Sequence, residues 1–251
     1  QVKIVDIGHD NFDSACEALE LGSVDMAVVD MAQLIRMEKN DENLPYGVVI
    51  SGVLKRGDSR YVMIRKRHAK DLIENAVVAT DSYSKTERIK HMYDGISCVV
   101  ETDIRKCIEK LDASECDAVF VLLEDIKAAR LHNSFLYRYT IMDYGECVPV
   151  HGEGVYAMLT KGKKEAVRTA RELSHKSTAE CFEIEDDIIS RVMQNVYVKT
   201  CDVYARISSD RLEIYADVTG NRGRIRVNER GTFVNKNLII TKIVDRISKS
   251  M

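Results

Sequence analysis

Apolar and polar residues along the chain follow two periods, which predicts a mixture of strands and helices. Residues 2–7 alternate as a short strand, and residues 12–21 place apolar side chains on one helical face that ends before Gly22. The nearly continuous apolar run at 24–31 is typical of a strand covered on both faces. A strand, a helix and a strand in this order predict a first βαβ unit and therefore an α/β lobe.

The alternation starts again after Pro45 and Gly47. The expected elements are strands at 46–54, 60–65, 76–80, 97–101 and 118–123, with helices at 84–93 and 103–111. Repeated βα units indicate a second α/β lobe with a mostly parallel sheet. Further strands are expected at 137–142 and 155–160, and we expect the second of these to return to the first lobe.

The last third of the chain has a different pattern. Residues 164–194 predict two helices that are broken near 174–177, where Ser and Thr are able to cap the second helix. Three alternating stretches follow at 196–207, 212–218 and 224–227, and a helix is expected at 235–248. This pattern predicts an α+β domain with a three-stranded antiparallel sheet.

The expected fold class is therefore α/β, with two lobes joined by a double crossover like that of periplasmic binding proteins, plus the small C-terminal α+β domain. We expect the first domain to contain residues 1–57 and 150–172. The second would contain residues 58–149, and the third residues 173–251.

Composition excludes several classes of protein. The chain has 251 residues, of which 45% are hydrophobic and 31% charged, and its formal net charge is -3. This lack of basic excess argues against nucleic-acid binding, and no apolar run reaches the length of a membrane span. Seven scattered cysteines without a C-x-x-C pair argue for reduced thiols and against a zinc site. We therefore expect a cytoplasmic protein without a metal, which is expected to be a monomer.

Cys201 is the candidate with the most specific chemistry. Lys199 and Arg206 lie close to it in the sequence and favour a thiolate, which is the reactive form of cysteine. The alternating neighbours place Cys201 near the start of a half-buried strand. The alternative is a buried cysteine that serves as a small hydrophobic residue.

Five short segments then match a known family in the right order. They read VDMAVVDMAQ at 24–33, ATDSYSK at 79–85, KLD at 110–112 followed by CDAVF at 116–120, PVHGEG at 149–154, and TCDV at 200–203. The corresponding family segments read ADIAVHSMKD, GTSSLRR, KLD with YDAII, PAVGQG, and GGCQV. The chain thus resembles porphobilinogen deaminase, also called hydroxymethylbilane synthase, which joins four porphobilinogens into a linear tetrapyrrole.

The resemblance implies three domains, an active site between the first two, and a dipyrromethane cofactor that is linked through a thioether to a cysteine of the third. Cys201 matches that cysteine. Gln33 stands where the family has its catalytic aspartate, and an amide does not act as a general base. Asp30, three residues earlier, is a possible substitute.

The family's paired arginines, which bind the carboxylates of the growing chain, correspond to Ser84 and Lys85. Glu101 stands at another arginine position, and Arg105 is a partial substitute for a third. A lysine keeps one charge but loses the bidentate geometry of a guanidinium. The family's first strand and the helix after it are absent as well, so either the chain is truncated or the first domain is degenerate.

Two functions remain open at this point. The first is a divergent porphobilinogen deaminase of haem biosynthesis, with porphobilinogen or another polycarboxylate pyrrole as its substrate. The second is a catalytically silent homologue that acts as a tetrapyrrole-binding or protein-interaction module.

Two local features also have open interpretations. His151 and Glu153 belong either to an anion-binding hinge loop or to a turn. Charges from 85 to 90 are expected to lie on a solvated helix face.

Overall fold

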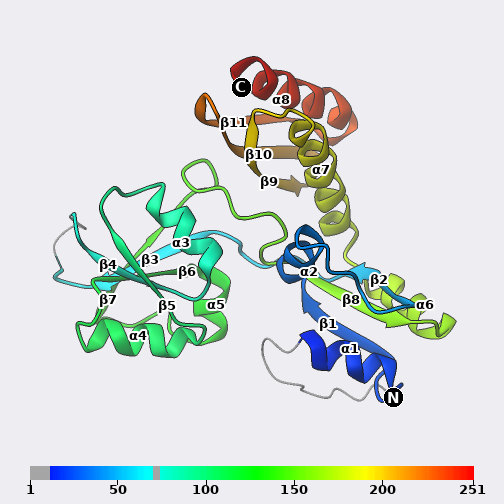
Figure 1. Ribbon diagram of the computed structural model, residues 1–251, viewed down its shortest axis with the longest axis horizontal. Coiled ribbons are helices and arrows are strands. Elements are labelled where there is room, and N and C mark those ends of the chain that lie inside the picture. Colours follow the sequence, from blue (N-terminus) through cyan, green and yellow to red (C-terminus); the bar gives the residue numbers. More distant parts are fainter. Residues whose placement is uncertain (1–11, 70–73) are drawn as a thin grey trace.

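The computed structural model describes residues 12–69 and 74–251 and arranges them around three separate sheets (Figure 1). The strand predicted at 2–7 lies outside the described residues. Each sheet draws its strands from one of the three predicted domains, whose exact bounds stay a prediction.

The first lobe contains a sheet of three strands in the order β1-β8-β2. Its strands are β1 (Met26–Asp30), β2 (Val48–Val53) and β8 (Tyr156–Lys161), and its helices are α1 (Phe12–Glu20), α2 (Met31–Lys39) and α6 (Lys164–Leu173). The central strand β8 pairs with both neighbours although more than 100 residues separate it from them. The expected return of this segment to the first lobe is confirmed, and so is the double crossover.

The second lobe contains five strands in the order β5-β4-β6-β3-β7. The strands are β3 (Tyr61–Lys66), β4 (Val77–Thr80), β5 (Ser97–Val100), β6 (Ala118–Leu122) and β7 (Tyr137–Ile141), and the helices are α3 (Tyr83–Lys90), α4 (Ile104–Asp112) and α5 (Leu123–Ala128). Strand β4 is parallel to β5 and β6, whereas β3 is antiparallel to β6 and β7. Strands β4, β5, β6 and β7 therefore point the same way, so the sheet is mostly parallel as expected, and β3, which enters from the first lobe, is the strand that runs against the others.

The C-terminal domain packs two helices on one face of an antiparallel sheet. Its elements are α7 (Lys176–Met193), β9 (Val198–Ser208), β10 (Arg211–Gly220), β11 (Gly223–Thr232), the short helix η1 (Phe233–Asn235) and α8 (Lys236–Ser250). The break between α6 and α7 is where the sequence predicted it. The cap of α7 is His175, whose ring nitrogen accepts a hydrogen bond from the backbone of Thr178, and not one of the serines.

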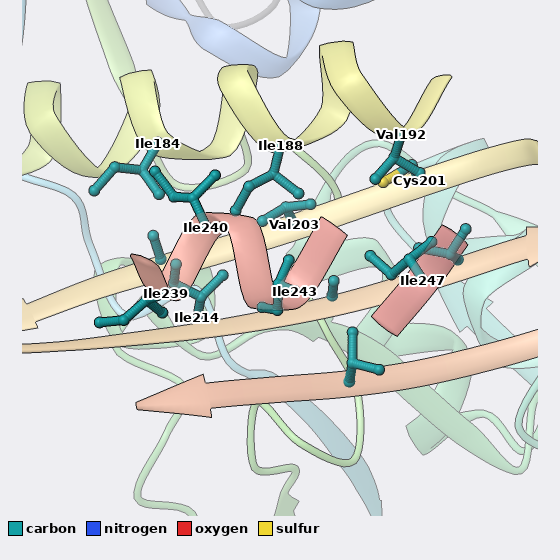
Figure 2. Packing of buried hydrophobic residues seen from close by; sticks show 14 of the residues in the cluster. Ile184, Ile188, Val192, Cys201, Val203, Ile214, Ile239, Ile240, Ile243 and Ile247 are labelled. Atoms are coloured by element: carbon teal, nitrogen blue, oxygen red, sulfur yellow. The ribbon is translucent and has the colours of Figure 1, made fainter. Parts of the chain in front are cut away.

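The core of this domain lies between the sheet and helices α7 and α8. Figure 2 shows isoleucines from both helices, such as Ile188 and Ile243, pointing towards side chains of the sheet. Along β9 the residues alternate, so that Cys201 and Val203 belong to this core. Because successive side chains of a strand point to opposite faces, Asp202 and Tyr204 face the other way.

Two segments cross between the lobes, the first at residues 54–60 and the second at residues 142–155. A buried ion pair joins the first crossover to the C-terminal domain. Arg56 donates two hydrogen bonds to Glu185 of α7, at 2.6 and 2.8 Å, and the two side chains are 9% and 1% exposed. Glu185 also accepts a hydrogen bond from the backbone nitrogen of Ala205 in β9. The pair therefore joins the interlobe crossover, α7 and the C-terminal sheet.

We predict that Arg56→Met lowers the stability of the C-terminal domain by about 3–5 kcal/mol, because it removes the guanidinium group that pairs with the buried carboxylate of Glu185. The measurement is the urea midpoint followed by tyrosine fluorescence. The control is Arg191→Met, which breaks the exposed Arg191–Asp187 pair on the same helix and should cost about 0–1 kcal/mol. Equal shifts for the two variants would show that the buried pair adds nothing.

Candidate functional site

Lys85 lies buried under the start of α3, in contact with carboxylates from two parts of the chain. Its ammonium group donates hydrogen bonds to both oxygens of Asp81, at 2.7 and 2.8 Å, and lies 3.4 Å from Glu153 in the second crossover. Asp125 of α5 is 3.9 Å away. The expectation of a solvated face was wrong for Lys85, which is only 4% exposed, and for Arg88, which is only 6% exposed, whereas Lys90 is exposed.

Glu153 is held in the second crossover by Tyr61 of β3. The hydroxyl of Tyr61 donates to the Glu153 carboxylate and accepts a hydrogen bond from the backbone of Val150. Burial and the charge of Glu153 raise the pKa of Tyr61 well above its usual range, so the phenol keeps the proton that it donates. Glu153 thus meets Tyr61 and Lys85 in this loop, and the two alternatives, an anion-binding hinge loop or a turn, stay predictions.

Asp30 belongs to the same cluster of charges although it comes from the first lobe. Burial is the main cause that raises the pKa of Asp125 to about 6, and the charges of Asp81, Glu153 and Asp30 add to it, whereas Lys85 lowers it. We refer to Asp30, Asp81, Asp125 and Glu153 as the interlobe acidic cluster. Three of these carboxyl groups, those of Asp81, Asp125 and Glu153, lie within 4 Å of the Lys85 ammonium group, and Asp30 acts on Asp125 through its charge.

Asp30 and Gln33 stand at the start of α2. Asp30 caps the helix, because its carboxylate accepts a hydrogen bond of 2.7 Å from the backbone nitrogen of Ala32. Gln33 lies half-buried in the first helical turn. At this end of α2, Asp30 and not Gln33 is therefore the ionisable group, and its charge acts on Asp125 of the second lobe.

Cys201 points into the core of the C-terminal domain. It is 7% exposed and lies beside Val192 of α7, as Figure 2 shows. Burial, followed by the charges of Asp202 and Asp217, raises the pKa of the Cys201 thiol to about 12, and Lys39 is the cation that opposes them. The expected thiolate was therefore wrong for this conformation, since Arg206 pairs instead with Glu213 across the sheet.

The neighbours of Cys201 line a polar cavity of about 180 Å³ between α3 and the outer face of the C-terminal sheet. Its walls contain Ser84, Glu87, Arg88, His91, Val150, Thr200, Asp202, Asp217, Thr219 and Arg224. We call it the α3–sheet cavity. Ser84 lines it together with Thr200 and Asp202, the two residues that flank Cys201.

Arg88 joins the walls of this cavity. It donates hydrogen bonds to Asp202 at 2.5 Å and to Asp217 at 3.2 Å, and Asp217 also binds Arg224 and Arg226. The sequence interpretation missed this set, although a lone aspartate inside the apolar strand at 212–218, followed by alternating arginines, is a readable signal of a buried pair.

Arg105 belongs neither to the charges around Lys85 nor to the walls of the α3–sheet cavity. It is exposed near the start of α4, where its guanidinium donates a hydrogen bond to the carbonyl oxygen of Ala129. Helix α4 packs on the opposite face of the five-stranded sheet from α3. A second hollow, of about 500 Å³ and lined by Lys66, Tyr137 and their neighbours, contains none of the predicted site residues.

The described residues offer no group of His, Cys, Asp and Glu that would hold a metal ion. Within the same part of the chain, no helix is both long and apolar enough to cross a membrane.

Comparisons with known proteins support the family resemblance, and the family match contains four of the five quoted segments but not the one at 200–203. The sequence model of the family described as "Porphobilinogen deaminase, dipyromethane cofactor binding domain" matches residues 10–169. A porphobilinogen deaminase of Clostridium acetobutylicum is 22% identical over 218 residues, which cover 81% of this chain and 74% of that protein. A porphobilinogen deaminase of Chlorobium luteolum is 24% identical over 192 residues, which cover 75% of this chain but only 60% of that protein.

Among solved structures, the periplasmic VFT2 domain of Bordetella pertussis BvgS has a TM-score of 0.43 at 18% identity, covering 66% of this chain and 68% of that one. An ABC transporter protein from Parabacteroides distasonis has a TM-score of 0.46 at 16% identity, covering 75% of this chain and 63% of that one.

We predict that His151 makes the stability of the second crossover depend on pH. Its Nε2 lies 2.9 Å from Asp186, and its Nδ1 lies 3.4 Å from Glu185, which also binds Arg56. Burial opposes the imidazolium, but hydrogen bonds to Asp186 and Glu185 outweigh it and raise the pKa of His151 above 6.5. A raised folded-state pKa means that the charged form stabilises the fold, fully so below the unfolded value.

The stability difference between wild type and His151→Gln should therefore be largest near pH 6 and shrink as the pH rises through the folded-state pKa. Urea midpoints from pH 5.5 to 9 test this. His175→Gln is the control, because the His175 ring caps α7 by accepting a hydrogen bond from the backbone nitrogen of Thr178. If the stability difference between wild type and His151→Gln grew with pH, the neutral form of His151 would be the stabilising one, and the prediction would be wrong.

We also predict that Cys201 resists N-ethylmaleimide in the native protein at pH 7.5 and reacts once urea unfolds the C-terminal domain. Its thiol is buried, and its raised pKa leaves very little thiolate. Mass mapping of labelled peptides measures the rate, with the half-buried Cys98 as the internal comparison. Labelling of Cys201 ahead of Cys98 in the native protein would contradict its inward orientation.

Proposed function

Because the chain belongs to the porphobilinogen deaminase family, we asked which parts of that chemistry its residues retain, and we propose that it is a non-polymerising member that acts as a binding module. The family membership defines the scaffold, whereas the activity depends on particular side chains. The proposal follows from four features of those side chains.

The orientation of Cys201 carries the proposal. Thr200 and Asp202 line the α3–sheet cavity, so the residue between them projects from the opposite face of β9. A cofactor attached to Cys201 would have to lie among the side chains of α7 and α8. Bringing the thiol into the cavity requires a shift of β9 by one residue, which would also expose Val203 and bury its polar neighbours.

The remaining residues at the family's cofactor positions do not fit dipyrromethane either. Such a group carries carboxylates, which the family's paired arginines bind. Ser84 has no charge, and the ammonium group of Lys85 is already bound by Asp81 and Glu153. A carboxylate next to Lys85 would also meet the interlobe acidic cluster, which repels it.

The catalytic acid of the family is missing at Gln33, so proton transfer lacks its usual group. The interlobe acidic cluster is strongly negative, and the family's substrates are polycarboxylates. Both features favour a protein that does not bind the growing pyrrole chain between its lobes.

One observation favours the other candidate, an active deaminase of tetrapyrrole biosynthesis. Asp125 has a pKa of about 6, which is suitable for a general acid or base near neutral pH, and its carboxyl group lies close enough to Asp30 for their charges to interact. In that candidate Asp125 and Asp30 handle protons in place of Gln33, and Cys201 anchors the primer after a rearrangement of β9.

The test is to express the chain with porphobilinogen present and to measure its intact mass, its pyrrole colour reaction and the ammonia that it releases. We expect the unmodified mass, no colour and no ammonia. The porphobilinogen deaminase of Clostridium acetobutylicum serves as the parallel sample. A pyrrole adduct that disappears in Cys201→Ser would refute the proposal. Ammonia release that falls in Asp125→Asn would establish the deaminase instead.

A further inference from the structure

A hollow of about 500 Å³ lies in the second lobe where the end of β3 meets β7 and the last turn of α4. Lys66 ends β3 and pairs across the sheet with Tyr137, the first residue of β7, while Asp112 ends α4. Tyr61, which binds Glu153, stands at the other end of β3, about 17 Å away at about 3.3 Å per strand residue. We call it the β3–β7 hollow, and it is separate from the interlobe acidic cluster.

The wall of the β3–β7 hollow has more positive than negative groups. Lys66 and Arg67 each bring one positive charge, and Asp112 is the one carboxylate among the lining residues that the structure describes. His68 also lines the hollow and is counted as neutral. Two cations and one carboxylate leave a formal excess of one positive charge.

The two cations of this hollow are not bound to carboxylates. The ammonium group of Lys66 donates to neutral acceptors, the carbonyl oxygen of Asp112 at 3.0 Å and the hydroxyl of Ser114 at 2.7 Å. The oxygens of the Asp112 carboxylate lie instead 2.7 and 2.9 Å from the hydroxyl of Tyr137, which donates to them. Arg67 is exposed, and its guanidinium group has no ion pair or hydrogen bond within the described part of the chain. An incoming anion therefore displaces no internal carboxylate from either cation.

An apolar wall stands next to these cations. Leu136 lines the hollow and is 68% exposed, and the buried ring of Tyr137 follows it in the chain. The backbone nitrogen of Arg67 donates to the carbonyl oxygen of Leu136 at 2.8 Å, which holds the two residues side by side. Covering an exposed leucine with an apolar ligand is favourable, because it removes apolar surface from water. The volume of the hollow also falls within the range of roughly 300–1,000 Å³ that is usual for small-molecule sites.

We propose that the β3–β7 hollow binds a monocarboxylate with an apolar body. Its carboxylate group would lie beside Arg67 and Lys66, and its body would cover Leu136 and the edge of Tyr137. A guanidinium group matches the two oxygens of a carboxylate, and a single negative charge balances the formal excess. The site does not rest on the proposed function, because it contains none of the residues on which that function depends.

The experiment is a titration of the full chain with 3-phenylpropionate at constant ionic strength. The matched probes are 3-phenylpropanol, which is neutral, 3-phenylpropylamine, which is cationic, and propionate, which lacks the apolar body. Calorimetry and the methyl resonances of Leu136 are the readouts. We expect saturable binding of 3-phenylpropionate with a Kd of about 1 mM, which a ligand of this size is able to reach. Each of the other three probes should bind at least about tenfold more weakly, because each lacks either the charge or the apolar contact.

Arg67→Gln should weaken the binding of 3-phenylpropionate about tenfold, because it removes a charge-assisted hydrogen bond. Arg130→Gln is the matched control, since Arg130 is an exposed arginine of the same lobe that does not line the hollow. Leu136→Ala should weaken the binding severalfold, with Leu173→Ala as its control, because Leu173 is a 58% exposed leucine of the first lobe. All four side chains are exposed, so we expect each variant to keep the thermal midpoint of the wild type.

The proposal would be overturned if 3-phenylpropionate showed no saturable binding to the wild type, or if the amine bound as tightly as the acid. It would equally fail if Arg67→Gln bound as tightly as Arg130→Gln, or Leu136→Ala as tightly as Leu173→Ala. None of these results bears on polymerisation, which is judged separately by ammonia release and intact mass.

Discussion

The C-terminal sheet packs against other parts of the chain on both of its faces, although outer residues such as Arg226 stay exposed, and this constraint determines the rest of the site. One face packs on α7 and α8, and the other meets α3 and the second crossover. Each strand must therefore supply apolar residues at alternate positions for the helical core and other residues for the second lobe. Cys201 faces the helical core, whereas Asp202 faces the α3–sheet cavity. The thiol is therefore separated from the cavity by the sheet.

The face of the C-terminal sheet that meets the second lobe contains both aromatic and charged side chains. Tyr144 of the second crossover stacks on Tyr204 with ring centroids 4.0 Å apart, and it also contacts Tyr215. Beyond these rings Arg88 reaches Asp202 and Asp217. Buried charges at such a junction cost desolvation energy, and they are tolerated only when each is paired in a good geometry. Their value here is orientation, because only one docking of the sheet satisfies all of them.

The sequence predicted nearly all strands and most helices, because their periods are local. It missed α2 because the helix starts inside an apolar run that also contains β1, and the cap at Asp30 was the only signal between them. It missed α5 because β6 leads into that helix without a loop. Burial of Lys85 and Arg88 was not readable, since their partners Glu153, Asp202 and Asp217 lie far away in the sequence. The face of Cys201 depends on the register of β9 with β10, which local alternation does not reveal.

If the protein is a binding module, as we propose, the internal ion pairs of α3 explain how the family scaffold persists without the family's chemistry. In the family, arginines near the start of α3 meet carboxylates that arrive with the ligand. In this chain the cations of α3 meet carboxylates that belong to the protein itself, Asp81 and Glu153 for Lys85 and Asp202 for Arg88. An internal carboxylate is always present at high effective concentration, so it outcompetes a dissolved one unless binding opens the interface. Under the proposed function, exchange of ligand carboxylates for internal ones therefore keeps the three parts of the chain docked while it removes the attraction for a polycarboxylate substrate.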